Sequence, residues 1–269
     1  MAATDEIDVG FWGVRGRIPR PGPETLRYGG NTPCIEMRPG AHRLIFDAGT
    51  GIRPLGDALN AEVPVSAHIF FSQTCFERIG GIPFFAAAYN PKNRFRLWAA
   101  SGAEKTAIRD VLADLMTDPV FPVPIDIMGA TLAFEDFAAG ETLEPAQDLR
   151  VRTAALNRGT PATGYRVEWA GKSVAYVSDL VAAPDGDEAA ALALLADADL
   201  AILNTAESDA QPSDWRAGLR LCDAAQVATC VLFHHHPDDD DAALDAIAAE
   251  ADALRPGTVV AREGLTLTV

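Results

Sequence analysis

Residues 67–81 read Ala-His-Ile-Phe-Phe-Ser-Gln-Thr-Cys-Phe-Glu-Arg-Ile-Gly-Gly. The apolar run 67–71 has the length and composition of a short buried β-strand. It ends on small polar residues, and a charged turn and a Gly pair follow it. An α/β enzyme often places its chemistry at the end of such a strand. The residue types are unusual for that role, because Gln73 cannot ionise and Cys75 is a lone thiol.

The first part of the chain is rich in short β-type runs separated by Gly- and Pro-rich turns. Helical spacing appears over 52–60 and 103–116, and Ser101 is a candidate N-cap for the second of these helices. Residues 117–129 contain three prolines and are predicted to form an extended loop. The predicted strands of this part are 7–12, 34–38, 43–47, 68–72, 132–137, 149–154, 164–169 and 173–177.

The remainder of the chain alternates between helix and strand. No linker or low-complexity segment interrupts the sequence, so residues 1–269 are predicted to form one domain. Each sheet needs a covered face, and two sheets inside with helices outside satisfy both patterns. The predicted elements are helices 187–197, 213–225 and 240–254, strands 200–203 and 229–233, and two short strands at the end.

Composition and charge exclude several classes of protein. Hydrophobic residues make up 48% of the chain, which is incompatible with a disordered protein. The net charge of −16 repels phosphate backbones, and the densest basic stretch, 92–96, holds three positive charges, so no nucleic-acid partner is expected. No stretch has the apolar length of a membrane span, no signal-peptide pattern opens the chain, and the four cysteines lack metal-site spacing. We expect an acidic cytoplasmic protein with reduced thiols and no membrane association.

Five motifs follow one another along the chain. They are Phe-Trp-Gly-Val-Arg-Gly at 11–16, Tyr-Gly-Gly-Asn-Thr at 28–32, Phe-Asp-Ala-Gly-Thr-Gly at 46–51, Val-Ser-Asp at 177–179 and Leu-Phe-His-His-His-Pro at 232–237. In this order and spacing they resemble the metallo-β-lactamase fold, in the branch of small cytoplasmic hydrolases related to phosphodiesterases and tRNA-processing enzymes. The resemblance covers nearly the whole chain. It implies an α/β fold of the four-layer αββα type, with two mixed β-sheets and helices on the outer faces.

The same resemblance implies that the loop after the strand 67–71 carries His-x-His-x-Asp-His, which holds most of a dinuclear metal site. Here the loop reads Gln73-x-Cys75-x-Glu77-Arg78. The three implied histidines of this loop are therefore replaced by Gln73, Cys75 and Arg78. The implied aspartate is replaced by Glu77.

The departures continue further along the chain. The next implied histidine ligand falls at Arg158, in Leu-Asn-Arg, and another falls at Pro212. Of the implied ligands, only the bridging aspartate, Asp179, and the late histidine, His234, remain. No metal and no other cofactor is therefore expected, although a single non-standard metal at Asp179 and His234 is left open.

Counting residues leads to the same expectation. Zinc is usually held by imidazole, thiolate or carboxylate, with three or four protein ligands per ion. The chain has five histidines, of which three are consecutive, one lies in the apolar strand and one lies in a turn. A two-metal site held largely by histidines cannot be assembled from them. The residues left for at most one metal are Cys75, Glu77, Asp179 and one of His234, His235 and His236.

Two arginines suggest what replaces the ions. A guanidinium is always charged and is a planar multiple donor that suits carboxylates. Arg78 and Arg158 are expected to pair with Glu77 and Asp179, which neutralises acids that would otherwise be buried without a partner. In the plainer interpretation these pairs only fill a vacated cavity. In the sharper one, an arginine stays partly free and binds a phosphate or carboxylate.

Cys75 and the three consecutive histidines have alternative interpretations. A Cys75 nucleophile would need a pKa lowered by Arg78 and a general base from the histidine cluster, whereas the plainer interpretation is a buried, inert cysteine. Among the histidines, alternation along the chain predicts that one faces the pocket and that the others contact solvent or a helix.

The predicted function is a pseudo-hydrolase with a degenerate metal site and no catalytic residues. It would bind an unknown small anionic ligand or a protein partner. The alternative is an active metal-dependent or Cys75-dependent hydrolase of phosphodiester or other ester substrates. The predicted pocket residues are Gln73, Cys75, Glu77, Arg78, Arg158, Asp179 and His234.

Overall fold

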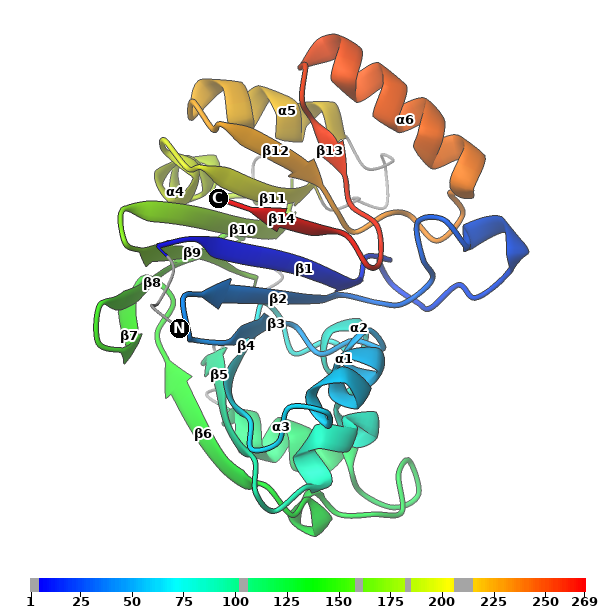
Figure 1. The fold of residues 1–269 in the computed structure, drawn as a ribbon, viewed down its shortest axis with the longest axis vertical. Coiled ribbons are helices and arrows are strands. Elements are labelled where there is room, and N and C mark those ends of the chain that lie inside the picture. The colour runs from blue at the N-terminus through cyan, green and yellow to red at the C-terminus, as the bar shows by residue number, and fades with distance from the viewer. Residues whose placement is uncertain (1–4, 102–105, 158–161, 182–184, 206–214) are drawn as a thin grey trace.

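A computed structural model describes residues 5–101, 106–157, 162–181, 185–205 and 215–269. Two seven-stranded sheets pack against each other, and helices lie on their outer faces (Figure 1). The predicted αββα sandwich with two mixed sheets is confirmed.

The first sheet has the order β14-β1-β2-β3-β4-β5-β6. Its β14, β1, β2 and β3 strands are antiparallel neighbours, while β3 to β6 run parallel, so the ends of β3 and β4 lie at the same edge. Helices α1 (Ile52–Leu59) and α3 (Ile108–Leu115) cover its outer face. The strands are β1 (Ile7–Gly13), β2 (Cys34–Pro39), β3 (Leu44–Phe46), β4 (Ser66–Phe71), β5 (Arg94–Ala100), β6 (Thr131–Phe137) and β14 (Thr266–Thr268).

The second sheet has the order β13-β12-β11-β10-β9-β8-β7, antiparallel from β7 to β10 and parallel from β10 to β13. Helices α4 (Glu188–Leu195), α5 (Trp215–Ala224) and α6 (Asp241–Leu254) accompany it (Figure 1). Within the described residues, none of the helices combines the length and apolar character that crossing a membrane requires. The strands are β7 (Thr142–Ala146), β8 (Leu149–Ala155), β9 (Thr163–Trp169), β10 (Lys172–Leu180), β11 (Leu200–Thr205), β12 (Thr229–Leu232) and β13 (Val259–Val260).

A core rich in aromatic side chains joins the two sheets. Phe46 and Phe70 of the first sheet stack with their ring centroids 5.2 Å apart, and Tyr165 of the second sheet packs edge-on against both. All three side chains are fully buried. Removing such a ring from water is worth about 1.5–3 kcal/mol, so this layer fixes how the sheets and their strand ends face each other.

The structure corrects several predicted elements. The strands β5 and β7 were not predicted, and the extended loop 117–129 contains the 3₁₀ turn η4 (Ile125–Ile127). Ala107, rather than Ser101, is the N-cap of α3, which starts later than predicted because the chain is still extended at Ala107. The predicted helix starts at residues 103 and 213 lie outside the described residues.

Candidate functional site

Side chains from both sheets meet at one edge of the sandwich. Asp47 and Ser72 directly follow β3 and β4, Asp179 lies near the end of β10, and His234 follows β12. The carboxyl ends of parallel strands share an edge, which brings together residues that are far apart in the sequence. Asp47, Asp179 and His234 all have left-handed backbones, with φ of 60°, 65° and 65°. Such backbones are costly for residues other than glycine and tend to cluster at functional sites.

A glycine in the first motif makes room for the histidine. A Cβ atom placed on Gly16 would lie 2.6 Å from the imidazole ring of His234, which is closer than real Cβ atoms approach other groups. The backbone N–H of Gly16 also donates to the carbonyl oxygen of His235. The first motif thus packs its backbone directly against the histidine segment.

Arg78 lies at the centre of this edge, on the one-turn helix α2 (Phe76–Ile79), and its side chain has no exposed surface. One terminal nitrogen donates to Asp47 at 2.9 Å and to the hydroxyl of Tyr176 at 2.8 Å. The other donates to Ser178 at 2.9 Å and to Asp179 at 2.5 Å. All four terminal N–H groups therefore have partners in the protein.

The remaining nitrogen of Arg78 faces Glu77. Its Nε atom lies 3.2 Å from Glu77 Oε1, close enough for an ion pair but without the alignment of a hydrogen bond. Burial opposes a charged guanidinium, but the surrounding carboxylates, above all Asp179, raise the pKa of Arg78 well above its ordinary value. The predicted pairing of Arg78 with acidic side chains is confirmed. Arg158 lies outside the described residues, so its predicted pairing stays a prediction.

Asp47 is a member of this cluster that the sequence reasoning missed. It is fully buried and accepts hydrogen bonds from the backbone N–H of Ser72 at 2.8 Å and from the hydroxyl of Tyr176 at 2.6 Å. Burial raises the pKa of Asp47, and contacts with Arg78, Tyr176 and Ser72 only partly oppose this effect. Its position directly after the buried strand Leu44–Phe46 was the signal that could have identified it.

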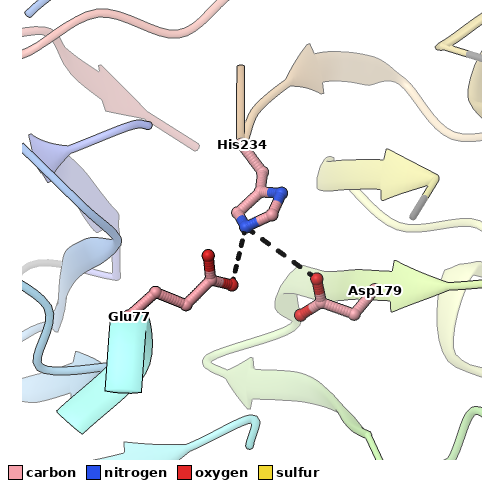
Figure 2. A group of neighbouring side chains, drawn as sticks. All are labelled: Glu77, Asp179 and His234. Carbon is pink, nitrogen blue, oxygen red and sulfur yellow. Dashed lines mark hydrogen bonds and ion pairs between the residues drawn. The ribbon is translucent and has the colours of Figure 1, made fainter. Parts of the chain in front are cut away.

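Glu77, Asp179 and His234 form a second group of contacts on the same edge (Figure 2). The Nε2 atom of His234 lies 2.9 Å from Glu77 Oε1 and 3.9 Å from Asp179 Oδ1. An ionised carboxylate only accepts hydrogen bonds, so Nε2 carries the proton in the contact with Glu77. The other ring nitrogen, Nδ1, lies 2.7 Å from the amide nitrogen of Asn204, which acts as its donor in this tautomer.

The contacts of Glu77 hold its carboxyl group in the ionised form. Burial alone would raise its pKa, but the hydrogen bond from His234, the charge of Arg78 and a bond from the backbone N–H of Arg17 lower it to about 2. Glu77 is therefore a carboxylate at neutral pH.

The donor atoms of Glu77, Asp179 and His234 all lie within 4.8 Å of one another, and their chemistry suits one cation. The carboxylates of Asp47, Glu77 and Asp179 outnumber the single guanidinium of Arg78, so the cluster as a whole is net negative. Within the residues that the structure describes, Glu77, Asp179 and His234 are the one group of three such side chains that lie close enough together to hold an ion, so they offer no second metal site. The guanidinium of Arg78 already occupies the space among the carboxylates.

Cys75 differs from both of its sequence-based interpretations. It is exposed, so the expectation of a buried cysteine is wrong. Partial desolvation of the thiol, reinforced by Glu77 and Asp179, raises its pKa to about 12, and Arg78 opposes this only in part. The lowered pKa on which a Cys75 nucleophile depends is therefore absent. Gln73, half-buried, lies in the same loop.

The three consecutive histidines have separate environments. His234 points toward Glu77 and Asp179 (Figure 2). His235 is buried and donates from Nε2 to the carbonyl oxygen of Ala261 at 2.7 Å, so the prediction of a solvent or helix contact is wrong for this residue. Burial lowers the pKa of His235 to about 4. His236 lies at the surface side of the segment, 3.7 Å from Asp238.

Fold and site together define a class of protein. The beta-lactamase superfamily domain matches residues 42–235, and the chain belongs to this family. It is thus a member of a metallo-β-lactamase-fold hydrolase family, and its candidate metal site consists of Glu77, Asp179 and His234.

Solved structures of similar proteins support the fold. The metallo-β-lactamase fold protein YhfI from Bacillus subtilis is 16% identical, with a TM-score of 0.68 over 99% of this chain and 100% of its own. A diphosphatase from the PhnP family is 16% identical, with a TM-score of 0.70 over 98% and 97%. The short form of human tRNase Z is 14% identical, with a TM-score of 0.65 over 97% and 98%. No functionally curated protein is significantly similar in sequence.

Proposed function

We propose that this protein is a pseudo-hydrolase in which the guanidinium of Arg78 replaces the metal ions and which acts by binding rather than by turnover. The observation that carries the proposal is the complete burial of Arg78 among Asp47, Glu77 and Asp179. A fixed cation in the same pocket disfavours a dication, because the two charges repel strongly in a poorly solvated site.

The described pocket residues also offer no substitute for a metal-activated nucleophile. A metal ion in this fold would lower the pKa of bound water, which is what generates a nucleophile at neutral pH. Cys75, with its pKa raised to about 12, stays a thiol under these conditions. The Nε2 atom of His234 is engaged with Glu77 and does not serve the thiol as a base.

A binding role agrees with the exposed residues beside the charged cluster. Glu77 accepts a hydrogen bond from the backbone of Arg17, and the neighbouring residues Phe76 and Ile18 are 68% and 59% exposed. Exposed apolar side chains beside a charged cluster favour a protein partner or a ligand with an apolar part. A cytoplasmic location, expected from the sequence, is part of the same proposal.

Metal analysis of the purified protein tests the proposal. Protein purified without chelator and dialysed against zinc or manganese should contain no stoichiometric ion by mass spectrometry, and calorimetric titration should show no tight binding. The variant His234→Ala is the matched control and should give the same result as the wild type. One tightly held ion per wild-type chain, lost in His234→Ala, would contradict the proposal.

A second candidate function is a single-metal hydrolase, and it has one observation in its favour. The donor atoms of Glu77, Asp179 and His234 are close together in a net negative cluster. These three side chains would hold the ion, which would supply Lewis acidity and an activated water. Hydrolysis of bis(p-nitrophenyl) phosphate that requires added metal and disappears in Asp179→Ala would establish this candidate. The proposal predicts no such activity.

A further inference from the structure

A cavity of about 270 Å³ opens at the other end of the strands that lead to Arg78. Its lining includes Ser66 and His68 of β4, Arg94 and Arg96 of β5, and Thr131 of β6. Strands β4, β5 and β6 are neighbours in the first sheet (Figure 1). They run parallel, with Ser66, Arg94 and Thr131 in register. These residues lie at the starts of the strands, whereas Ser72 and the Arg78 cluster lie beyond the end of β4. The cavity is therefore separate from the candidate metal site.

The lining side chains belong to the inner face of the first sheet. His68 is two residues from Phe70, and Arg96 is two residues from Trp98, so each pair lies on one face of its strand. Phe70 and Trp98 stack within the core between the sheets, with centroids 5.7 Å apart. An inner face would ordinarily carry apolar residues up to its end. At this end of the first sheet, the inner face instead carries cationic and hydroxyl side chains that line the cavity.

His68 presents a fixed N–H donor to this cavity. The indole N–H of Trp98 donates to Nδ1 of His68 at 3.0 Å. An indole nitrogen is only a donor, so Nδ1 must accept, and the proton of the neutral ring lies on Nε2. Desolvation, reinforced by the charge of Arg96, lowers the pKa of His68 to about 4, which keeps the ring neutral at pH 7. Within the described ranges, no protein group accepts a hydrogen bond from Nε2 of His68.

Arg94 and Arg96 add two guanidinium groups on the same face. Arg94 is exposed, and within the part of the chain that the structure describes it has no acidic partner at ion-pair distance. Arg96 lies over the ring of Trp98, 5.8 Å from its centroid, and has a loose contact of 3.6 Å with Glu135, which is 40% exposed. The two guanidinium groups thus retain donors for an additional acceptor, unlike the four terminal N–H groups of Arg78.

We propose that this cavity binds the phosphate group of a small phosphomonoester. The residues that line the cavity, on three strands, carry two guanidinium groups, the Nε2–H of His68 and the hydroxyls of Ser66 and Thr131. An acceptor with oxygens pointing in several directions satisfies such donors better than a planar carboxylate. The volume exceeds what one phosphate needs and leaves space for an organic moiety. In a chain of net charge −16, saturable anion binding requires a local site of this kind.

Titration with inorganic phosphate, followed by NMR, tests this inference in the full chain. The readout is the indole N–H signal of Trp98, one of four tryptophans, because its hydrogen bond to His68 places it beside the cavity. Ionic strength is held constant with sodium chloride. We expect a saturable shift of this signal. Arg94→Gln and Arg96→Gln should each weaken binding about tenfold or more, as expected for the loss of a charged hydrogen bond.

Arg109→Gln is the matched control, since it removes the same charge from an exposed arginine paired with Asp126 elsewhere on the surface. It should bind phosphate as the wild type does. Acetate should shift the Trp98 signal at least tenfold more weakly than phosphate does. The inference is overturned if phosphate gives no saturable shift, if Arg94→Gln binds as tightly as Arg109→Gln, or if acetate binds as well as phosphate. None of these outcomes depends on whether the Arg78 pocket binds a metal.

Discussion

Arg15 and Arg78 are both completely buried, yet they lie in opposite kinds of surroundings. The side chain of Arg15 donates to backbone carbonyl oxygens, at 2.8 Å to Gly29, 3.2 Å to His236 and 2.6 Å to Asp239. The side chain of Arg78 donates to carboxylates and hydroxyls at the strand ends.

The pKa values of the two arginines move in opposite directions because their direct partners differ. Desolvation, and then repulsion from Arg20, lowers the pKa of Arg15, although more distant acids oppose this. At Arg78, carboxylates in direct contact outweigh desolvation and raise the pKa. Arg15 therefore joins chain segments through neutral acceptors, whereas Arg78 balances buried negative charge. Burial of an arginine alone therefore does not show that it balances charge; the charge of its direct partners does.

Replacing Arg78 with methionine should have the largest effect. The substitution keeps much of the side-chain volume but leaves Asp47 and Asp179 buried without their cation. Breaking a buried ion pair by removing one partner costs about 3–5 kcal/mol. Urea denaturation at pH 7.5 measures the loss of unfolding free energy. A loss below about 1 kcal/mol would mean that the carboxylates do not depend on Arg78.

The penalty of Arg78→Met should also depend on pH. The pKa of Asp47 is already raised by burial and should rise further without the guanidinium. A carboxyl group whose pKa is higher in the folded state than in the unfolded state stabilises the fold at low pH, and this contribution is lost as the pH rises. The difference in unfolding free energy between wild type and variant should therefore be clearly smaller at pH 4.5 than at pH 7.5. An equal difference at both values would argue against charge balance.

Replacing Arg15 with methionine should have a smaller effect. The substitution leaves neutral carbonyl oxygens without a donor, which costs about 1–3 kcal/mol. Because no carboxylate is a direct partner of Arg15 in the described hydrogen bonds, the loss should be nearly the same at pH 4.5 and pH 7.5. The same denaturation series measures it. A pH dependence as steep as that of Arg78→Met would remove the distinction between the two arginines.

Arg109→Met should have the smallest effect. Arg109 and Asp126 form an exposed pair at 3.3 Å, with side chains 52% and 78% accessible to solvent. Exposed pairs of this kind contribute about 0–1 kcal/mol, and salt screens them. A change above that range would show that total charge, rather than burial, dominates the response of this acidic protein.

The sequence was sufficient for the layers of the fold but not for every strand. The spacing of apolar residues along the chain correctly predicted β1 and β2. It also predicted the alternation of helices and strands in the second part of the chain. Strand β5 escaped because Arg94 and Arg96 lie on its inner face, where an apolar residue is expected. Strand β7 is short and contains Pro145, which is unusual inside a strand.

Site residues that belong to a sequence motif could be predicted. Site residues that reach the site only through the packing of the fold could not. Glu77, Arg78, Asp179 and His234 were identified from the loop after β4 and the later motifs. Tyr176 belongs to the same hydrogen-bond network, but no local pattern distinguishes it from any other inward-facing residue of a strand. The exposure of Cys75 likewise depends on how the loop turns after Ser72, which the residue types alone do not fix.

Arg78 also has a consequence for how the molecule opens. Its guanidinium joins Asp47, at the end of β3 in one sheet, to Tyr176 and Ser178 of β10 in the other. Separating the sheets would break the contacts of Arg78 with β10 and leave Asp179 without its cation, so partial opening at this edge is strongly disfavoured. The amide protons of β3 and β10 are therefore expected to exchange with solvent in a single cooperative step rather than sheet by sheet. Arg78 is thus expected to couple the two sheets into one unfolding unit.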